Sequence, residues 1–217
     1  MSGSLQNEIT AIVLAGGESS RMGSDKALLP IGQNILLSHI CLIAQRWTTK
    51  VYVVTPWIKR YQGILPKGCQ LVQEELIFNA SSNTPLIGFA QGLKLVQTEW
   101  VMLLACDLPN LSSSQVKQWV QNLATVLPTE VAFLPRHAKG WEPLCGFYRQ
   151  EILFSLEAHI DSGGKSFQSW LTQQSIKELK VSDRDSLFNC NTPEDWKFFE
   201  QSYLPDMKKL KNQGDLW

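Results

Sequence analysis

The fold is decided near the start of the chain, by the stretch Ile9–Lys26, which reads ITAIVLAGGESSRMGSDK. Its first part, Ile9–Ala15, is a continuous apolar run rich in β-branched residues. Such a run is typical of a strand that is buried on both faces of a parallel sheet. A glycine-rich loop begins directly after it, at Gly16 and Gly17. Because open parallel sheets bind ligands beyond the carboxyl ends of their strands, we expect this loop to carry function.

Strands and helical segments alternate along the rest of the chain. The most hydrophobic run, Glu99–Cys106 (EWVMLLAC), predicts a buried strand that ends directly before Asp107. Further strands are predicted at 50–55, 69–74, 130–135, 144–149 and 176–181, and helices at 35–47, 84–96, 112–126, 152–159, 166–173 and after Thr192. This alternation predicts a single Rossmann-like domain over residues 9–203, a three-layer α/β/α fold with a mainly parallel sheet. We expect residues 1–8 to be an N-terminal extension and residues 204–217 a flexible tail.

Composition disfavours several classes of protein. The chain of 217 residues balances 20 Lys and Arg against 20 Asp and Glu, whereas nucleic-acid and anionic-membrane binding need a cationic excess. No apolar run is long enough to cross a bilayer, and the start of the chain lacks a signal-peptide pattern. The cysteines and histidines are dispersed, without metal-ligand spacing. We therefore expect a cytoplasmic protein with small-molecule substrates.

The glycine loop combines flexible backbone with positive charge. Gly16, Gly17 and Gly23 allow backbone N–H groups to approach phosphate oxygens, and Arg21 and Lys26 supply charge there. The pattern is neither a P-loop nor a dinucleotide fingerprint, because its glycine spacing differs and Ser24 rather than Lys follows Gly23. A phosphate cradle and a plain glycine turn with solvated charges both remain open at this point.

The motif itself resembles a known family. Leu14–Lys26 matches the nucleotidyltransferase signature L-A-G-G-x-x-x-R-M-G-x-D-K at every fixed position. Its LAGG form resembles the molybdenum cofactor guanylyltransferases, whereas cytidylyl-transferring relatives typically have LAAG. Further similar segments are TPLIG at 84–88, CDLP at 106–109, EPL at 142–144 and FNCNTPED at 188–195, so the resemblance covers about residues 9–203.

This resemblance implies transfer of GMP from GTP to molybdenum-bound molybdopterin, with Mg²⁺ required and pyrophosphate released. It implies catalytic roles for Lys26, Arg21 and Asp107, with Asp107 also the metal ligand. The implied GTP-binding residues are Leu14, Ala15, Gly16, Gly17, Lys26, Glu75 and Asp107, and the acceptor-side candidates are Glu142, Asn189 and Asn191. We expect a monomer that binds GTP and molybdopterin, with molybdoenzymes or their chaperones as candidate recipients of the product.

Two departures from the family pattern leave base selectivity open. Thr55 stands where the family usually has Asn, and Glu74-Glu75 where it usually has Asp. A related nucleotidyltransferase with another nucleotide or acceptor, such as the cytidylyl form, therefore stays an alternative, as does a non-catalytic nucleotide-binding paralogue. Taken by position alone, Asp107 also suits a turn before the next helix, and Asn189 and Asn191 suit turn and cap chemistry.

Overall fold

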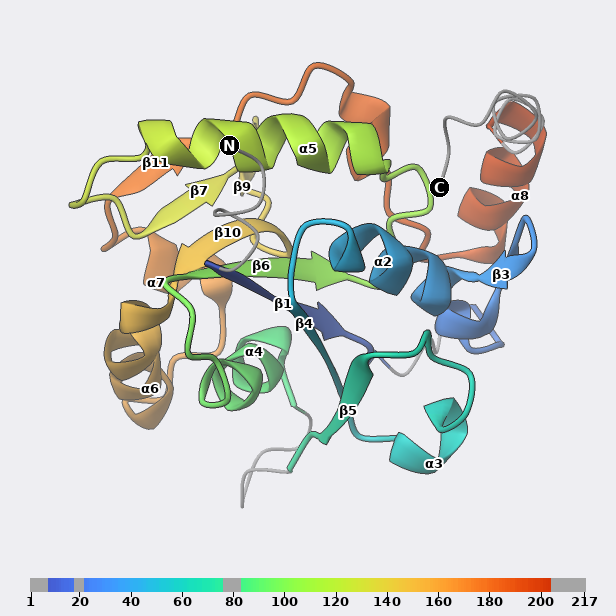
Figure 1. The fold of residues 1–217 in the computed structure, drawn as a ribbon, viewed down its shortest axis with the longest axis horizontal. Coiled ribbons are helices and arrows are strands. Elements are labelled where there is room, and N and C mark those ends of the chain that lie inside the picture. The colour runs from blue at the N-terminus through green and yellow to red at the C-terminus, as the bar shows by residue number, and fades with distance from the viewer. Residues whose placement is uncertain (1–7, 18–21, 76–82, 204–217) are drawn as a thin grey trace.

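The computed structural model describes residues 8–17, 22–75 and 83–203, so Arg21, residues 1–7 and the tail at 204–217 lie outside the described residues. Its centre is a seven-stranded sheet in the order β11-β7-β10-β6-β1-β4-β5 (Figure 1). The strands are β1 (Ile9–Leu14), β4 (Lys50–Thr55), β5 (Cys69–Gln73), β6 (Trp100–Ala105), β7 (Ala132–Leu134), β10 (Cys145–Arg149) and β11 (Ile176–Glu178). β10 runs antiparallel to both of its neighbours, and the other pairs are parallel. The predicted mainly parallel sheet is therefore confirmed.

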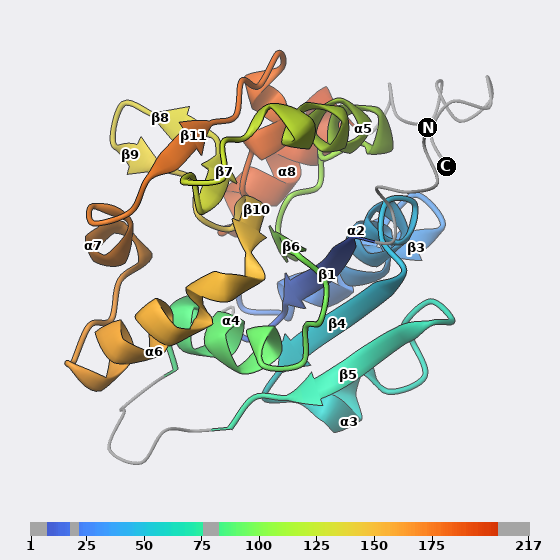
Figure 2. The ribbon, with the colours of Figure 1, turned by 60° about the vertical axis from the view of Figure 1, so that its left-hand side comes forward.

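Helices cover both faces of the sheet (Figure 2). On β1, Ala11 and Val13 point into one core, while Ile12 points into the other, as strand alternation requires. The first core is closed by α2 (Leu36–Gln45) and α5 (Ser113–Asn122), with Tyr61 from α3 (Ile58–Tyr61). The second is closed by α4 (Pro85–Leu93), α6 (Leu153–Asp161) and α7 (Phe167–Leu171). These layers confirm the α/β/α class.

Several short elements have no counterpart in the sequence-based expectation. They are the hairpins β2 (Pro30–Ile31) with β3 (Asn34–Ile35) and β8 (Arg136–His137) with β9 (Gly140–Trp141), the helix α3, and 3₁₀ turns at Lys26–Leu28, Leu123–Thr125, Gln150–Ile152 and Arg184–Leu187. Elements of two to four residues carry too few positions for a period to be recognised. The predicted helix at 112–126 is shorter for a related reason, because its last turn tightens into the 3₁₀ turn at Leu123–Thr125.

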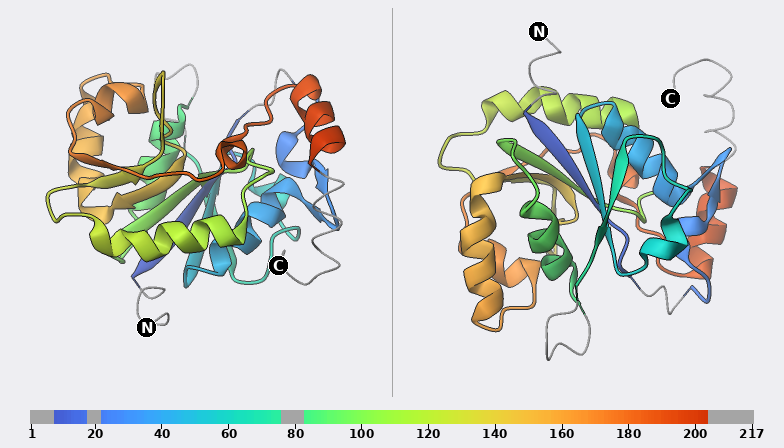
Figure 3. Two further views of the ribbon diagram at one scale, coloured as in Figure 1. Left: turned by 90° about the horizontal axis from the view of Figure 1, so that it is seen from above. Right: turned by 60° about the horizontal axis from the view of Figure 1, so that its bottom comes forward.

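A third, smaller core attaches the last helix to the N-terminal half. α8 (Pro193–Ser202) contributes Trp196 and Phe199, which pack with Ile31 of β2 and Leu36 of α2. Figure 3 shows α8 beside the β2–β3 hairpin, away from α6 and α7. Thr192 caps α8 in a capping box with Asp195, as the sequence predicts. The residues just before α8 are thereby held at the carboxyl end of the sheet.

The start of α4 differs from its expected form. Thr84 occupies the N-cap position and Pro85 the first helical position, at the start of the helix predicted at 84–96, but the Thr84 hydroxyl makes no capping hydrogen bond. This hydroxyl is therefore not used by the backbone of α4. In the part of the chain that the structure describes, no helix is both long and apolar enough to span a membrane.

Candidate active site

The candidate site lies at the carboxyl end of β1, where the strand order of the sheet reverses. From β1 the chain adds β4 and β5 on one side and then crosses to add β6 on the other. Ligands bind at this kind of switch point because the loops after the two neighbouring strands diverge. Two hydrogen bonds tie the strand ends together: Cys106 N–H donates to Leu14 O at 3.3 Å, and the buried Thr55 hydroxyl donates to Ala15 O at 2.9 Å.

A cavity of about 130 Å³ opens at this point. Its walls are Leu14, Gly16, Gly17, Lys26, Glu74, Asn83, Thr84, Pro85, Gly88, Ala105, Cys106, Asp107 and Leu144. The structure therefore brings together five of the expected nucleotide-site residues, from the glycine loop and from the end of β6. Ala15 lies in the same loop but is not part of the wall, since its carbonyl oxygen accepts the Thr55 bond.

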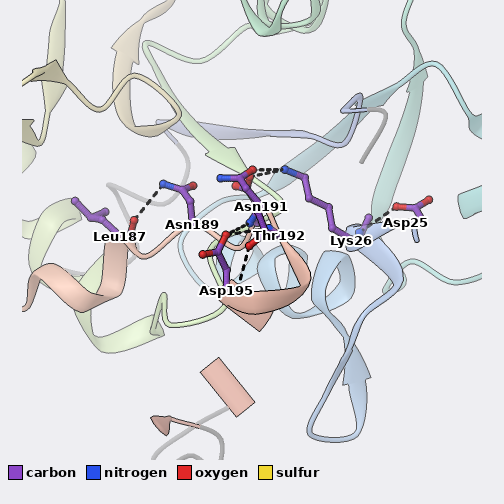
Figure 4. A network of polar contacts seen from close by, with 9 residues as sticks. Asp25, Lys26, Leu187, Asn189, Asn191, Thr192 and Asp195 are labelled. Atoms are coloured by element: carbon purple, nitrogen blue, oxygen red, sulfur yellow. Dashed lines mark hydrogen bonds and ion pairs between the residues drawn. The ribbon is translucent and has the colours of Figure 1, made fainter. Parts of the chain in front are cut away.

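Lys26 and Asp107 form an ion pair on the cavity wall. The Lys26 Nζ lies 2.6 Å from Oδ2 of Asp107 and 3.2 Å from Oδ1 of Asn191 (Figure 4). Both charged side chains are mostly buried, with 15% and 11% of their surface exposed. The preceding residue, Asp25, accepts hydrogen bonds from Arg60 at 2.9 Å and from the Tyr61 hydroxyl at 2.8 Å, which anchors the loop on α3. The ammonium group is therefore held at a fixed place beside the cavity.

The segment before α8 reaches this ion pair from the far end of the sequence. Asn191 N–H donates to Oδ2 of Asp195 at 2.9 Å, inside the capping box that starts α8 (Figure 4). Asn189 behaves differently, because its side-chain amide donates to Leu187 O at 3.2 Å. Of the two asparagines predicted for the acceptor side, the described contacts thus join only Asn191 to Lys26, and through Lys26 to Asp107.

Glu74, rather than the expected Glu75, faces the cavity. Glu74 is 7% exposed, and its burial raises the pKa of the carboxyl above its usual range, an effect that a hydrogen bond with Asn83 partly opposes. Glu75 is exposed and lines a separate groove beside α4 and α6. The signal that separates them is register: Gln73 pairs with Thr55 at the end of β5, so Glu74 is the first residue beyond the strand. The sequence alone shows two adjacent glutamates at this point and does not show which of them follows the last paired residue of β5.

Three buried polar atoms of the cavity wall have no hydrogen-bond partner among the described residues. They are Oδ1 of Asn83, Oγ1 of Thr84 and Oδ1 of Asp107. Buried polar atoms without partners are rare in folded proteins because each loses its hydration, so a group of three at one cavity indicates a site that a polar ligand completes.

The same observation tests the site for a metal ion. Asp107 is 8% exposed and keeps one carboxylate oxygen free of protein partners, which suits a hard cation such as Mg²⁺. Among the described residues no cluster of three or more His, Cys, Asp or Glu could hold a metal by itself. Mg²⁺ commonly binds through one or two carboxylates together with substrate phosphates, so Asp107 fits that mode.

Glu142 lies in a neighbouring groove rather than in the cavity. It lines this groove with His137, Lys139 and Arg184, and its Oε2 lies 3.6 Å from Nε2 of His137. Burial raises the pKa of the Glu142 carboxyl, and the negative charge of Asp107 adds to the increase. The groove therefore lies along the β8–β9 hairpin, and Glu142 is the residue of its lining on which the charge of Asp107 acts.

A glycine loop, a lysine and a buried aspartate at the switch point of an α/β sheet suit the binding of a phosphorylated ligand, and the family match identifies the class of protein as a nucleotidyltransferase. The sequence model of the MobA-like NTP transferase domain matches residues 11–178, and the chain belongs to this family. This match confirms the resemblance carried by the Leu14–Lys26 motif.

Individual relatives narrow the class further. A probable molybdenum cofactor guanylyltransferase from Nostoc sp. is 51% identical over 87% of this chain and 89% of its own length. One from Synechococcus elongatus is 39% identical over 88% of this chain and 98% of its own. At these identities the chain is a member of the molybdenum cofactor guanylyltransferases. The fold is shared with molybdopterin-guanine dinucleotide biosynthesis protein A from Archaeoglobus fulgidus, at a TM-score of 0.70, 18% identity and coverage of 88% and 97% of the two chains.

Proposed function

We propose that the chain transfers GMP from GTP to the terminal phosphate of molybdenum-bound molybdopterin, releasing pyrophosphate and forming the guanine dinucleotide of the cofactor. The observation that carries this proposal is the Lys26–Asp107 pair, which faces the glycine-loop cavity with one Asp107 oxygen unpartnered. Relatives named as guanylyltransferases supply the identity of the donor and the acceptor.

The nucleotide lies, on this proposal, along the glycine loop. Leu14, Ala15, Gly16 and Gly17 bind it by main-chain groups and by close approach of the backbone. Lys26 neutralises phosphate charge, and Arg21 adds a second cation from the same loop. Because two partners already hold the Lys26 ammonium, little side-chain entropy is lost when phosphate arrives.

Asp107 would hold Mg²⁺ through its unpartnered oxygen. When bound, the ion would neutralise phosphate charge and orient the reacting groups. The ion pair with Lys26 holds the Asp107 side chain at the cavity wall, so its second oxygen is positioned for a cation before substrate binds.

The reaction needs no strong general base. A phosphate oxygen of the acceptor, already ionised near neutral pH, attacks the α-phosphorus, and the bond to pyrophosphate breaks with its electron pair leaving on pyrophosphate. The chain is consistent with this chemistry. Burial raises the pKa of the Cys106 thiol to about 12, so this neighbour of Asp107 is not an ionised nucleophile near neutral pH. Buried His39 has its pKa lowered to about 4 and lies in α2, outside the cavity wall.

The acceptor lies on the opposite side of Asp107 from the glycine loop. Asn191 contacts Lys26, and Glu142 with its basic neighbours His137 and Lys139 borders the adjacent groove. Asn189 completes the acceptor side. We further propose that the chain works as a cytoplasmic monomer and passes its product to molybdoenzymes or their chaperones.

The test is pyrophosphate release in the presence of Mg²⁺, molybdenum-bound molybdopterin and one nucleoside triphosphate at a time. We expect release with GTP alone among the four common nucleotides. Release with CTP and not GTP would contradict the guanylyl assignment. No release with any nucleotide would instead support a non-catalytic binding protein.

A further inference from the structure

We infer that Asn83 determines selectivity for guanine, by fixing the Glu74 carboxylate and by placing its own side-chain oxygen beside it as a second acceptor. The inference rests on the proposed function, because it takes GTP as the donor. It assigns the selectivity to a residue that lies outside the segments resembling the family, directly before Thr84.

The orientation of the Asn83 amide follows from its neighbours. Its Nδ2 donates to the backbone oxygen of Glu75 at 3.2 Å, a contact that requires the NH₂ end because a turned amide would set its oxygen against the Glu75 oxygen. The Asn83 Oδ1 therefore points away from the Glu75 oxygen, and it is buried without a partner among the described residues. Asn83 is also near enough to Glu74 to lower the pKa of that carboxyl, against the effect of burial, and both residues line the cavity.

Glu74 is confined in a matching way. A Cβ on Gly16 would lie 2.5 Å from Glu74 Oε2, and a Cβ on Gly88 would lie 3.4 Å from Oε1. The carboxylate is thus enclosed between two glycines, one in the nucleotide loop and one on α4, with Asn83 on a third side. It can present acceptors to the cavity and has little freedom to turn away.

Adjacent acceptors select one kind of nucleobase edge. Guanine carries two neighbouring donors, the ring N1–H and the 2-amino group. Adenine and cytosine set an amino donor beside a ring-nitrogen acceptor, and uracil has one ring donor between two carbonyl oxygens. An acceptor facing an acceptor leaves both groups buried and unpaired, which penalises these three bases. Glu74 and Asn83 together therefore match guanine.

Inosine triphosphate separates this inference from a generic nucleotide pocket, because it lacks only the 2-amino group of GTP. We would measure equilibrium binding of GTP, ITP and 2′-deoxy-GTP to the full chain with Mg²⁺ by calorimetry. The native chain should bind GTP about tenfold more tightly than ITP, since one buried hydrogen bond distinguishes them. The native chain should prefer 2′-deoxy-GTP over ITP by nearly the same factor as it prefers GTP over ITP.

Asn83→Ala should remove most of the GTP preference over ITP. The matched control is Asn122→Ala, which deletes an exposed asparagine whose amide bonds Gln118 O at 2.9 Å on α5, and this variant should keep the preference. Equal binding of GTP and ITP by the native chain would overturn the inference without any variant. The inference would also fail if Asn83→Ala kept the native ratio of GTP to ITP affinity. It would fail as well if 2′-deoxy-GTP bound weakly and ITP did not, because that result would place Asn83 at the ribose. A native chain that prefers CTP would refute the proposed function itself, and this inference with it.

Discussion

The backbone N–H of Cys190 donates to the carbonyl oxygen of Asp107 at 3.0 Å, which joins the segment before α8 to the residue that follows β6. One residue later, Asn191 reaches Lys26, and Lys26 reaches Asp107. The last helix is therefore part of the site: its capping box positions Asn191, and Asn191 helps to position the Lys26 ammonium at the cavity wall.

Asn191→Ala should lower kcat about tenfold, because a hydrogen bond to a charged group is worth roughly 1.5–3 kcal/mol and the variant removes the Asn191 oxygen that lies 3.2 Å from the Lys26 ammonium. KM for GTP should change less, since the backbone of the glycine loop is untouched. Steady-state pyrophosphate release gives both constants. Unchanged kcat would show that Lys26 needs no support from the C-terminal segment.

Thr192→Ala should reduce both stability and activity. Loss of the capping hydroxyl costs about 1 kcal/mol of unfolding free energy, and it loosens Asp195, whose carboxylate also holds Asn191 N–H. Ser112→Ala is the matched control, because Ser112 caps α5 with Gln115 in the same kind of capping box, away from the cavity wall. Urea unfolding should show similar losses for both, whereas kcat should fall only in the Thr192 variant. Equal kcat values in the two variants would show that the cap of α8 has no effect on catalysis.

Asp107→Ala should abolish turnover while the fold is retained. The variant loses the proposed metal ligand and leaves the partly buried Lys26 ammonium without its 2.6 Å carboxylate partner. Asp107→Asn keeps the size of the side chain and removes the charge, so it should also be inactive, and added Mg²⁺ should not restore it. Pyrophosphate release over a Mg²⁺ titration, with circular dichroism as the fold control, measures this. A normal rate in either variant would remove Asp107 from the metal site.

The sequence predicts the long elements and the Lys26–Asp107 side of the cavity, but not the side formed by Glu74 and Asn83. β1 and β6 are continuous apolar runs, which predict buried parallel strands. Because β1 and β6 are parallel neighbours, their carboxyl ends lie side by side, and this brings together the motif that ends at Lys26 and the motif that begins at Cys106. The direction of β10 was beyond a periodicity argument, because the same alternation suits parallel and antiparallel neighbours.

The Glu74 and Asn83 side of the cavity depends on single-residue register and on contacts between loops. Whether Glu74 or Glu75 enters the cavity is decided by where β5 stops, which residue types alone do not state. Asn83 belongs to none of the recognised segments, and the role inferred for it depends on folding, which places it on the same cavity wall as Glu74. Thr84 fits a helix cap by type, yet its hydroxyl is left for the cavity because no α4 backbone N–H bonds to it.

Glu74→Gln should stabilise the fold and impair GTP binding together. Burial raises the pKa of Glu74, so the folded chain binds this proton more readily than the unfolded chain. The stability contributed by the protonated carboxyl is present below the unfolded pKa and is lost as pH rises through the folded one. At neutral pH the ionised group therefore destabilises the fold, and the neutral amide removes that cost. Thermal unfolding should show a higher melting temperature for Glu74→Gln at pH 7 and a smaller difference at acidic pH, with Glu75→Gln near the native value. A lower melting temperature at pH 7 would contradict the sign.

Gly16→Ala should weaken GTP binding because the two glycines of the loop have different surroundings. A Cβ at Gly16 would meet Glu74 Oε2 at 2.5 Å, whereas among the described residues a Cβ at Gly17 would come near Lys26 Cε alone, at 3.7 Å. Neither glycine has a positive φ, so alanine strains the backbone at neither position. The Gly16 methyl must therefore displace a buried carboxylate, a form of overpacking that typically costs about 1–3 kcal/mol. Unfolding measurements should show this loss for Gly16→Ala and a native-like value for Gly17→Ala. Calorimetry should show the Gly16 variant losing its preference for GTP over ITP, because the displaced Glu74 no longer stands beside Asn83; a retained preference would mean that the carboxylate does not contact the base.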